Sequence, residues 1–138
     1  MLVMLVFVTG AMAQVKDNKG NLLVGYWNDS VKSNTMLRQK INIGTQSGIT
    51  ISYRLTQVTD TITGVASVWC SIDDTTWAKY PNIDSIAISA KTDLEYIWHI
   101  NNKADGLDVR YFEIRTRCPS NTTNSTSKAR VRTKVFPY

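Results

Sequence analysis

Residues 49–55 read Ile-Thr-Ile-Ser-Tyr-Arg-Leu, a strict alternation of apolar and polar side chains. Successive side chains of a β-strand point to opposite faces, so the stretch predicts a strand with Ile49, Ile51, Tyr53 and Leu55 on a buried face. An α-helix would repeat its apolar residues every three or four positions. No such pattern of useful length follows residue 14, so the sequence predicts a chain built from strands.

Similar alternation or short apolar runs recur along the chain, bounded by Gly, Asn, Asp, Ser or Pro. The further segments expected as strands are residues 22–27, 36–43, 65–71, 85–89, 94–100, 111–118 and 128–136. Alternation in these segments places further apolar side chains on the core side, together with Ile49, Ile51 and Tyr53. They are Ala66, Val68, Ile86, Ile88, Phe112 and Ile114. About eight short strands without a crossover helix predict an all-β fold, an antiparallel β-sandwich of jelly-roll or immunoglobulin-like type.

The length of 138 residues suits one domain that buries its own core. Hydrophobic residues make up 43% of the chain and charged residues 20%, which is typical of a globular protein. Sixteen basic and 11 acidic side chains give a net charge of +5. This excess favours an acidic or anionic partner surface. Most mildly basic small proteins bind no nucleic acid, and none is expected as the partner here.

An apolar segment opens the chain, and we divide the sequence into this segment, residues 1–21, and a sandwich domain, residues 22–138. The run Met1–Val8 followed by Ala11-Met12-Ala13 is typical of a secretory signal, but no Lys or Arg precedes it. It is also too short to span a bilayer. The alternative is a retained, extended arm used in assembly. The side chains expected to bury themselves in a neighbouring subunit are Leu2, Val3, Leu5, Val6 and Phe7.

Catalytic patterns are missing from the sequence. His99 is the only histidine and lies within a predicted strand, and no P-loop, GxSxG or HExxH motif occurs. We therefore expect no enzyme, no cofactor and no metal. Asp73 and Asp74 form an acidic pair in a predicted turn, and we expect them to bind backbone amides rather than calcium.

Cys70 and Cys118 are the only cysteines and stand 48 residues apart without a CxxC motif. Two interpretations remain open. A structural disulfide would form between them outside a reducing compartment. Alternatively, they are two buried free thiols that pack as small hydrophobes.

Four tryptophans, at positions 27, 69, 77 and 98, raise the hypothesis of glycan binding, because indole rings stack on sugar rings. Trp69 is the best candidate, since its neighbours Val68 and Cys70 point to the other face of the strand. The alternative is that the indoles fill the core or a subunit interface.

The last predicted strand carries a cation at every second position, and these cations share one face: Lys128, Arg130, Arg132 and Lys134. Arg115 and Arg117 add two more on an earlier strand. One interpretation is a solvated face that protects a sheet edge from aggregation. The other is a surface that docks onto an acidic protein.

Residues 49–138 show a characteristic order of predicted strands and turns. The strand 64–71 runs through the polar turn 72–76 into Trp77, and a proline turn follows at residues 79–81. Later come an aromatic strand at 96–98, an arginine-bearing strand at 110–115, the Ser/Thr-rich loop 120–127 and the basic last strand. This order resembles small β-sandwich structural proteins of tailed bacteriophages, with Asp74 standing where they have a turn glycine.

The resemblance implies a role in the virion, as a capsid decoration, head-fibre or tail protein, and no catalytic residues. Its expected partners are other virion proteins, including the major capsid protein, in a multi-copy or homo-oligomeric assembly. The alternative from the residues themselves is a secreted carbohydrate-binding module that uses residues 1–13 as a true signal and the surface tryptophans as its site.

Overall fold

The computed structural model describes residues 24–44, 46–59, 62–89, 93–102, 105–119 and 127–137. These residues contain strands and no helix, and therefore no helix long and apolar enough to cross a membrane. The strands are β1 (Gly25–Lys32), β2 (Thr35–Asn42), β3 (Gly48–Thr59), β4 (Gly64–Ser71), β5 (Ala78–Lys79), β6 (Ile86–Ile88), β7 (Leu94–Asn101), β8 (Tyr111–Cys118) and β9 (Lys128–Pro137).

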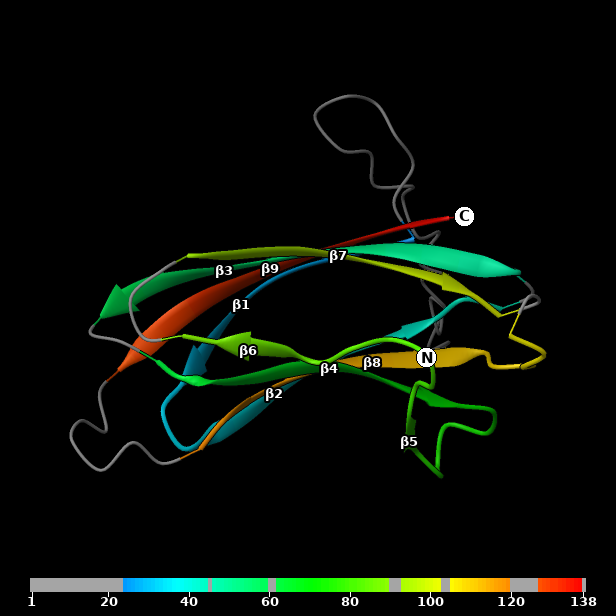
Figure 1. Ribbon diagram of the computed structural model, residues 1–138, viewed down its shortest axis with the longest axis horizontal. Coiled ribbons are helices and arrows are strands. Elements are labelled where there is room, and N and C mark those ends of the chain that lie inside the picture. The colour runs from blue at the N-terminus through cyan, green and yellow to red at the C-terminus, as the bar shows by residue number, and fades with distance from the viewer. Residues whose placement is uncertain are drawn as a thin grey trace, which may run out of the picture.

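The strands form two antiparallel sheets that pack face to face (Figure 1). The first sheet has the order β1-β9-β3-β7, and the second has the order β2-β8-β4-β5, with β6 also paired to β4. Apart from the step through β4, β5 and β6, each connection crosses from one sheet to the other. Immunoglobulin-like domains instead keep several consecutive strand pairs within one sheet. The chain is therefore a β-sandwich of the jelly-roll type.

The core lies between the sheets and is built by the alternation seen in the sequence. All nine side chains predicted to face inward are buried, and none is more than 8% exposed: Ile49, Ile51, Tyr53, Ala66, Val68, Ile86, Ile88, Phe112 and Ile114. Tyr53 packs edge-on against Trp98, with ring centroids 5.6 Å apart. The inward parity of several strands is thus confirmed, because a one-residue slip would have sent each set to solvent.

Two polar bridges cross the apolar core from one sheet to the other. The hydroxyls of Tyr53 on β3 and Thr116 on β8 lie 2.9 Å apart, and both residues are fully buried. Gln39 on β2 donates to the Asp29 carboxylate at 2.9 Å and accepts a hydrogen bond from the Thr133 hydroxyl at 2.6 Å. These bonds satisfy polar atoms that would otherwise be costly to bury.

The prediction for two strands was wrong. The first was expected to end at Trp27, whereas β1 starts at Gly25 and continues to Lys32 through Asn28, Asp29 and Ser30. The polar run is compatible with a strand because Asn28 and Ser30 face solvent, while Asp29 reaches Gln39. The two-residue strand β5 was not predicted, since so short a segment shows no periodicity.

Candidate functional site

The outer face of the first sheet is basic. Ala129, Val131, Thr133 and Val135 of β9 are fully buried, so the alternating cations of this strand face outward, as the sequence predicted. These four, Lys128, Arg130, Arg132 and Lys134, together with Lys32 on β1 and Arg54 on β3, are here called the basic face.

The strand register of the basic face sets like charges beside each other. Arg54 stands directly opposite Arg132 across the β3–β9 pair, and Lys32 stands opposite Lys128 across the β1–β9 pair. Glu95, opposite Arg54 on β7, is the one carboxylate among the outward positions of the four described strands. Within the described residues, no carboxylate lies within 4 Å of any of the four β9 cations. Among the described residues, the four β9 cations therefore form no ion pair.

A shallow pocket of about 140 Å³ lies in the basic face, lined by Ser52, Arg54, Glu95, Arg132 and Lys134. It is smaller than the pockets that hold drug-sized ligands, which measure about 300–1,000 Å³. Its lining carries three cations and one carboxylate, so the pocket is positively charged overall.

The edge-protection interpretation of the β9 cations is wrong. β9 lies inside its sheet, with β1 on one side and β3 on the other. Cations that protect an edge stand on strands with an unpaired side. The other part of that interpretation, a solvated face, agrees with the structure, since Arg130 and Arg132 are exposed.

The second sheet brings together Trp69 and Arg115 on its outer face. The Arg115 guanidinium carbon lies 4.0 Å above the centre of the Trp69 ring and 6.0 Å from that of Trp77. The indole nitrogen of Trp69 donates to the Ser67 hydroxyl at 3.0 Å. The ring face that carries the guanidinium is not available to a sugar. Trp98, another of the four tryptophans, is buried at 2% exposure and lies in the core.

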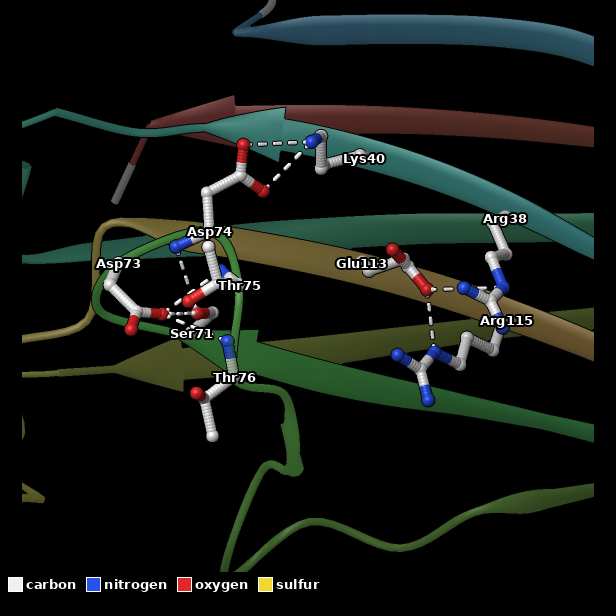
Figure 2. Close-up of polar contacts among 9 residues, drawn as sticks. All are labelled: Arg38, Lys40, Ser71, Asp73, Asp74, Thr75, Thr76, Glu113 and Arg115. Atoms are coloured by element: carbon white, nitrogen blue, oxygen red, sulfur yellow. Dashed lines mark hydrogen bonds and ion pairs between the residues drawn. The ribbon is translucent and has the colours of Figure 1, made fainter.

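Glu113 holds Arg115 in place and was missed by the sequence analysis. Its carboxylate accepts a hydrogen bond from Arg115 Nε at 2.5 Å, and Arg38 Nε lies 3.7 Å from the same oxygen (Figure 2). Glu113 is only 5% exposed, and a buried charge needs a partner. The sequence did contain a signal for this role: Glu113 is the one carboxylate on the outward side of residues 111–118, next to Arg115 and Arg117.

The turn after β4 is organised by Asp73. One carboxylate oxygen accepts hydrogen bonds from the amides of Thr75 and Thr76 at 2.9 Å and from the Ser71 hydroxyl at 3.0 Å (Figure 2). The Thr76 amide, then the Thr75 amide, together with side-chain hydrogen bonds, hold the pKa of Asp73 well below its usual range. The prediction that Asp73 binds backbone amides is confirmed.

Asp74 behaves differently from the prediction, because its carboxylate binds Lys40 Nζ on β2 at 2.8 and 2.9 Å rather than a backbone amide (Figure 2). Its backbone has a φ of 65°, a conformation that favours glycine. Among the described residues, no three His, Cys, Asp or Glu side chains form a group able to hold a metal ion.

Cys70 and Cys118 are free and buried. Cys70 stands opposite Phe112, whereas Cys118 ends the same partner strand six residues further on, about 20 Å away. A disulfide needs Cα atoms about 4.4–6.8 Å apart, so the disulfide interpretation is wrong. Burial raises the pKa of Cys70, and raises that of Cys118 to about 11.

The remaining predicted residues lie apart from these clusters. Arg117 is on the outer face of β8, opposite Met36 and Val65 on the neighbouring strands. His99 lies on the outer face of β7, with Nδ1 3.1 Å from the Thr50 hydroxyl. The predicted assembly arm, with Leu2, Val3, Leu5, Val6 and Phe7, lies outside the described residues.

Comparison with known proteins supports the fold alone. No protein-family model matches the chain, and no curated protein sequence matches it. A solved structure described as a CBM4, a carbohydrate-binding module, matches with a TM-score of 0.50 and 15% identity, over 83% of this chain and 72% of its own. The structure of the Gt strain of infectious bursal disease virus matches with a TM-score of 0.51 and 7% identity, over 83% of this chain. The match spans 32% of that viral chain, so the chain corresponds to about a third of its length.

Proposed function

We propose that the protein is a non-enzymatic structural protein of a tailed-phage virion, associated with the capsid as a decoration or head-fibre protein. In this proposal the basic face docks onto an acidic surface of another virion protein, such as the major capsid protein. The order of elements in residues 49–138 supports the phage assignment. The jelly-roll topology, which recurs in viral capsid proteins, agrees with it.

The observation that carries the docking proposal is the set of cations on the interior strand β9 that have no carboxylate within 4 Å in the described part of the chain. Arg54 and Arg132 repel each other across the β3–β9 pair, and directly opposed like charges destabilise a sheet. A partner that supplies carboxylates removes this cost on binding and gains complementary charge. The pocket beside Arg132 and Lys134 gives one such carboxylate a place to bind.

The carbohydrate-binding alternative remains an outcome of the test. It predicts a secreted chain that begins near Gln14 and binds glycans through Trp69. The guanidinium of Arg115 on the Trp69 ring reduces the indole surface available for this role.

The first experiment is mass spectrometry of purified virions from the phage that encodes the chain. We expect the chain in the particles, with its first residues intact. The proposal is overturned if the chain is missing from the virions and is recovered from the medium beginning near Gln14.

The second experiment reverses charge on the basic face. Arg132→Glu with Lys134→Glu should lower the affinity for virions stripped of the protein at least about tenfold, because like charges across an interface cost several kcal/mol. Lys79→Glu is the control, since Lys79 is exposed on β5 of the other sheet. Equal binding by the two variants would show that the basic face is not the docking surface.

A further inference from the structure

The edge strand β7 has one open side. Among the described strands it is the last of its sheet and pairs with β3 alone. In an antiparallel pair about half of the residues direct their backbone N–H and C=O groups away from the neighbour. Beyond the β3 pair, Asn101 at the end of β7 accepts a backbone hydrogen bond from Asp105, and this contact lies outside residues 94–100. The open side is thus able to receive another strand.

This edge also lacks the usual protection against pairing. Edge strands in monomers carry lysines, prolines or bulges, and β2 at the edge of the other sheet carries Arg38 and Lys40. β7 carries one carboxylate, Glu95, and no lysine, arginine or proline. Ile97 is 54% exposed and Tyr96 is 37% exposed. The strand offers apolar side chains next to unpaired backbone groups.

The sequence of β7 is complementary to itself about Ile97. In an antiparallel pair centred on this residue, position 97 + n stands opposite position 97 − n of the second strand. Three kinds of match result. Glu95 meets His99, Tyr96 meets Trp98, and Leu94 meets Ile100. An acid meets a base, an aromatic ring meets an aromatic ring, and an aliphatic side chain meets another.

The faces of the sheet agree with this register. Tyr96 and Trp98 share the inward parity of β7, because they stand opposite Tyr53 and Ile51 of the core. Glu95, Ile97 and His99 share the outer parity. In the centred pair each residue meets one of its own face, so aromatic pairs extend the inner layer and carboxylate–imidazole pairs extend the outer one. Cross-strand pairs of these types stabilise antiparallel sheets.

We infer that β7 pairs antiparallel with β7 of a second copy of this chain, about a two-fold axis through Ile97, and joins the two first sheets into one eight-stranded sheet. Both basic faces then lie on the same side of the joined sheet. Two docking surfaces presented together bind a multi-copy partner with higher avidity than one. The pairing itself does not depend on the docking proposal.

The register gives a direct test by cross-linking. Residues directly opposite each other in an antiparallel pair have Cα atoms about 4.5 or 5.5 Å apart, within the range of a disulfide. The Ile97→Cys variant of the full chain should therefore form a covalent dimer under mild oxidation. Val58→Cys is the matched control, since Val58 is equally exposed at 54% but lies outside the β3–β7 register.

A second variant tests the position of the axis. Glu95→Cys should not cross-link, because Glu95 would meet His99 and lie four residues from its own copy, while Glu95→Cys with His99→Cys should cross-link. The native thiols do not interfere, as Cys70 and Cys118 are buried. The inference is overturned if Ile97→Cys dimerises no faster than Val58→Cys, or if Glu95→Cys alone dimerises as fast as Ile97→Cys.

Charge exchange gives an independent readout by analytical ultracentrifugation. Glu95→Lys should weaken the dimer about tenfold, because a favourable pair becomes unfavourable at two symmetric positions. Adding His99→Glu to the same chain should restore the dimer, since opposite charges again face each other. Failure of the double variant to recover the affinity of the native chain would overturn the proposed register.

Discussion

The hydrogen bond between Tyr53 and Thr116 allows the energy of joining the two sheets to be measured. Both residues are fully buried, and the hydroxyl oxygens lie 2.9 Å apart. Burial raises the pKa of the Tyr53 phenol above its usual range, so the phenol stays protonated. Tyr53→Phe keeps the ring against Trp98 but leaves the Thr116 hydroxyl without this partner. A buried polar group that loses its partner costs about 1–3 kcal/mol.

The reverse change, Thr116→Val, preserves shape and leaves the Tyr53 hydroxyl unpartnered, with a cost of the same size. The double variant removes both hydroxyls and leaves neither group unsatisfied, so it should lie within about 1 kcal/mol of the native chain. Summed independently, the single losses would give about 2–6 kcal/mol. The expected coupling is therefore on the order of 1–6 kcal/mol, with the double variant more stable than either single variant.

The assay is guanidinium denaturation of the four proteins, whose curves should share one m value. Thermal melting supports it, since a change of about 1 kcal/mol in the free energy of unfolding shifts Tm by about 4 °C at this chain length. Tyr26→Phe is the control, since Tyr26 is 45% exposed and water can replace its partners. If the loss in the double variant equals the sum of the single losses, the reasoning from an unsatisfied buried hydroxyl is refuted.

Two further predictions concern charge. Asp73→Ala should destabilise the chain by a constant amount above pH 5, and the difference in stability should shrink as pH falls below about 4. The reason is that the folded state lowers the pKa of Asp73. The stabilisation by Asp73 is therefore complete above the unfolded pKa of about 3.9 and is lost as pH falls through the lower folded pKa. Urea titrations from pH 7 down to pH 2 measure this, and a difference independent of pH over the whole range would contradict it. Arg132→Gln should stabilise the isolated chain by about 0.2–1 kcal/mol, because it removes the repulsion from Arg54. The gain should fall in 0.5 M salt, and a loss of stability at low salt would count against the uncompensated basic face.

Period-2 alternation was enough to predict most strands and their buried faces. The segment 111–118 was predicted with the bounds that β8 has, since every second residue there is apolar or small. Alternation is a local property of the chain and depends on no partner strand. It failed at β1, where Asp29 occupies an inward position because Gln39 reaches it from the other sheet.

The order of the strands could not be predicted, because pairing joins segments far apart in the sequence. β1 lies beside β9, so the choice between jelly-roll and immunoglobulin-like topology depended on contacts across nearly the whole domain. For the same reason, the contact between Lys40 and Asp74, which are 34 residues apart, could not be predicted from the sequence. It also left the distance between Cys70 and Cys118 undetermined until their strands were placed.

The two outer faces of the sandwich differ in how their cations are paired, and this contrast is the reason that the docking proposal uses the first sheet. On the second sheet, Arg38 and Arg115 share Glu113, and Lys40 binds Asp74. On the first sheet, the β9 cations have no carboxylate within 4 Å among the described residues.

Solubility alone does not explain this difference, because both faces carry positive charge, yet among the described residues the cations within 4 Å of a carboxylate all belong to the second sheet. Nor does protection of an edge, because the four cations stand on β9, an interior strand, while β7, one of the two edge strands of this sheet, has no lysine or arginine. The docking proposal accounts for the repulsion kept inside the sheet, because a partner would supply the carboxylates. The inferred pairing of β7 accounts for the edge, because a second copy would complete its backbone hydrogen bonds.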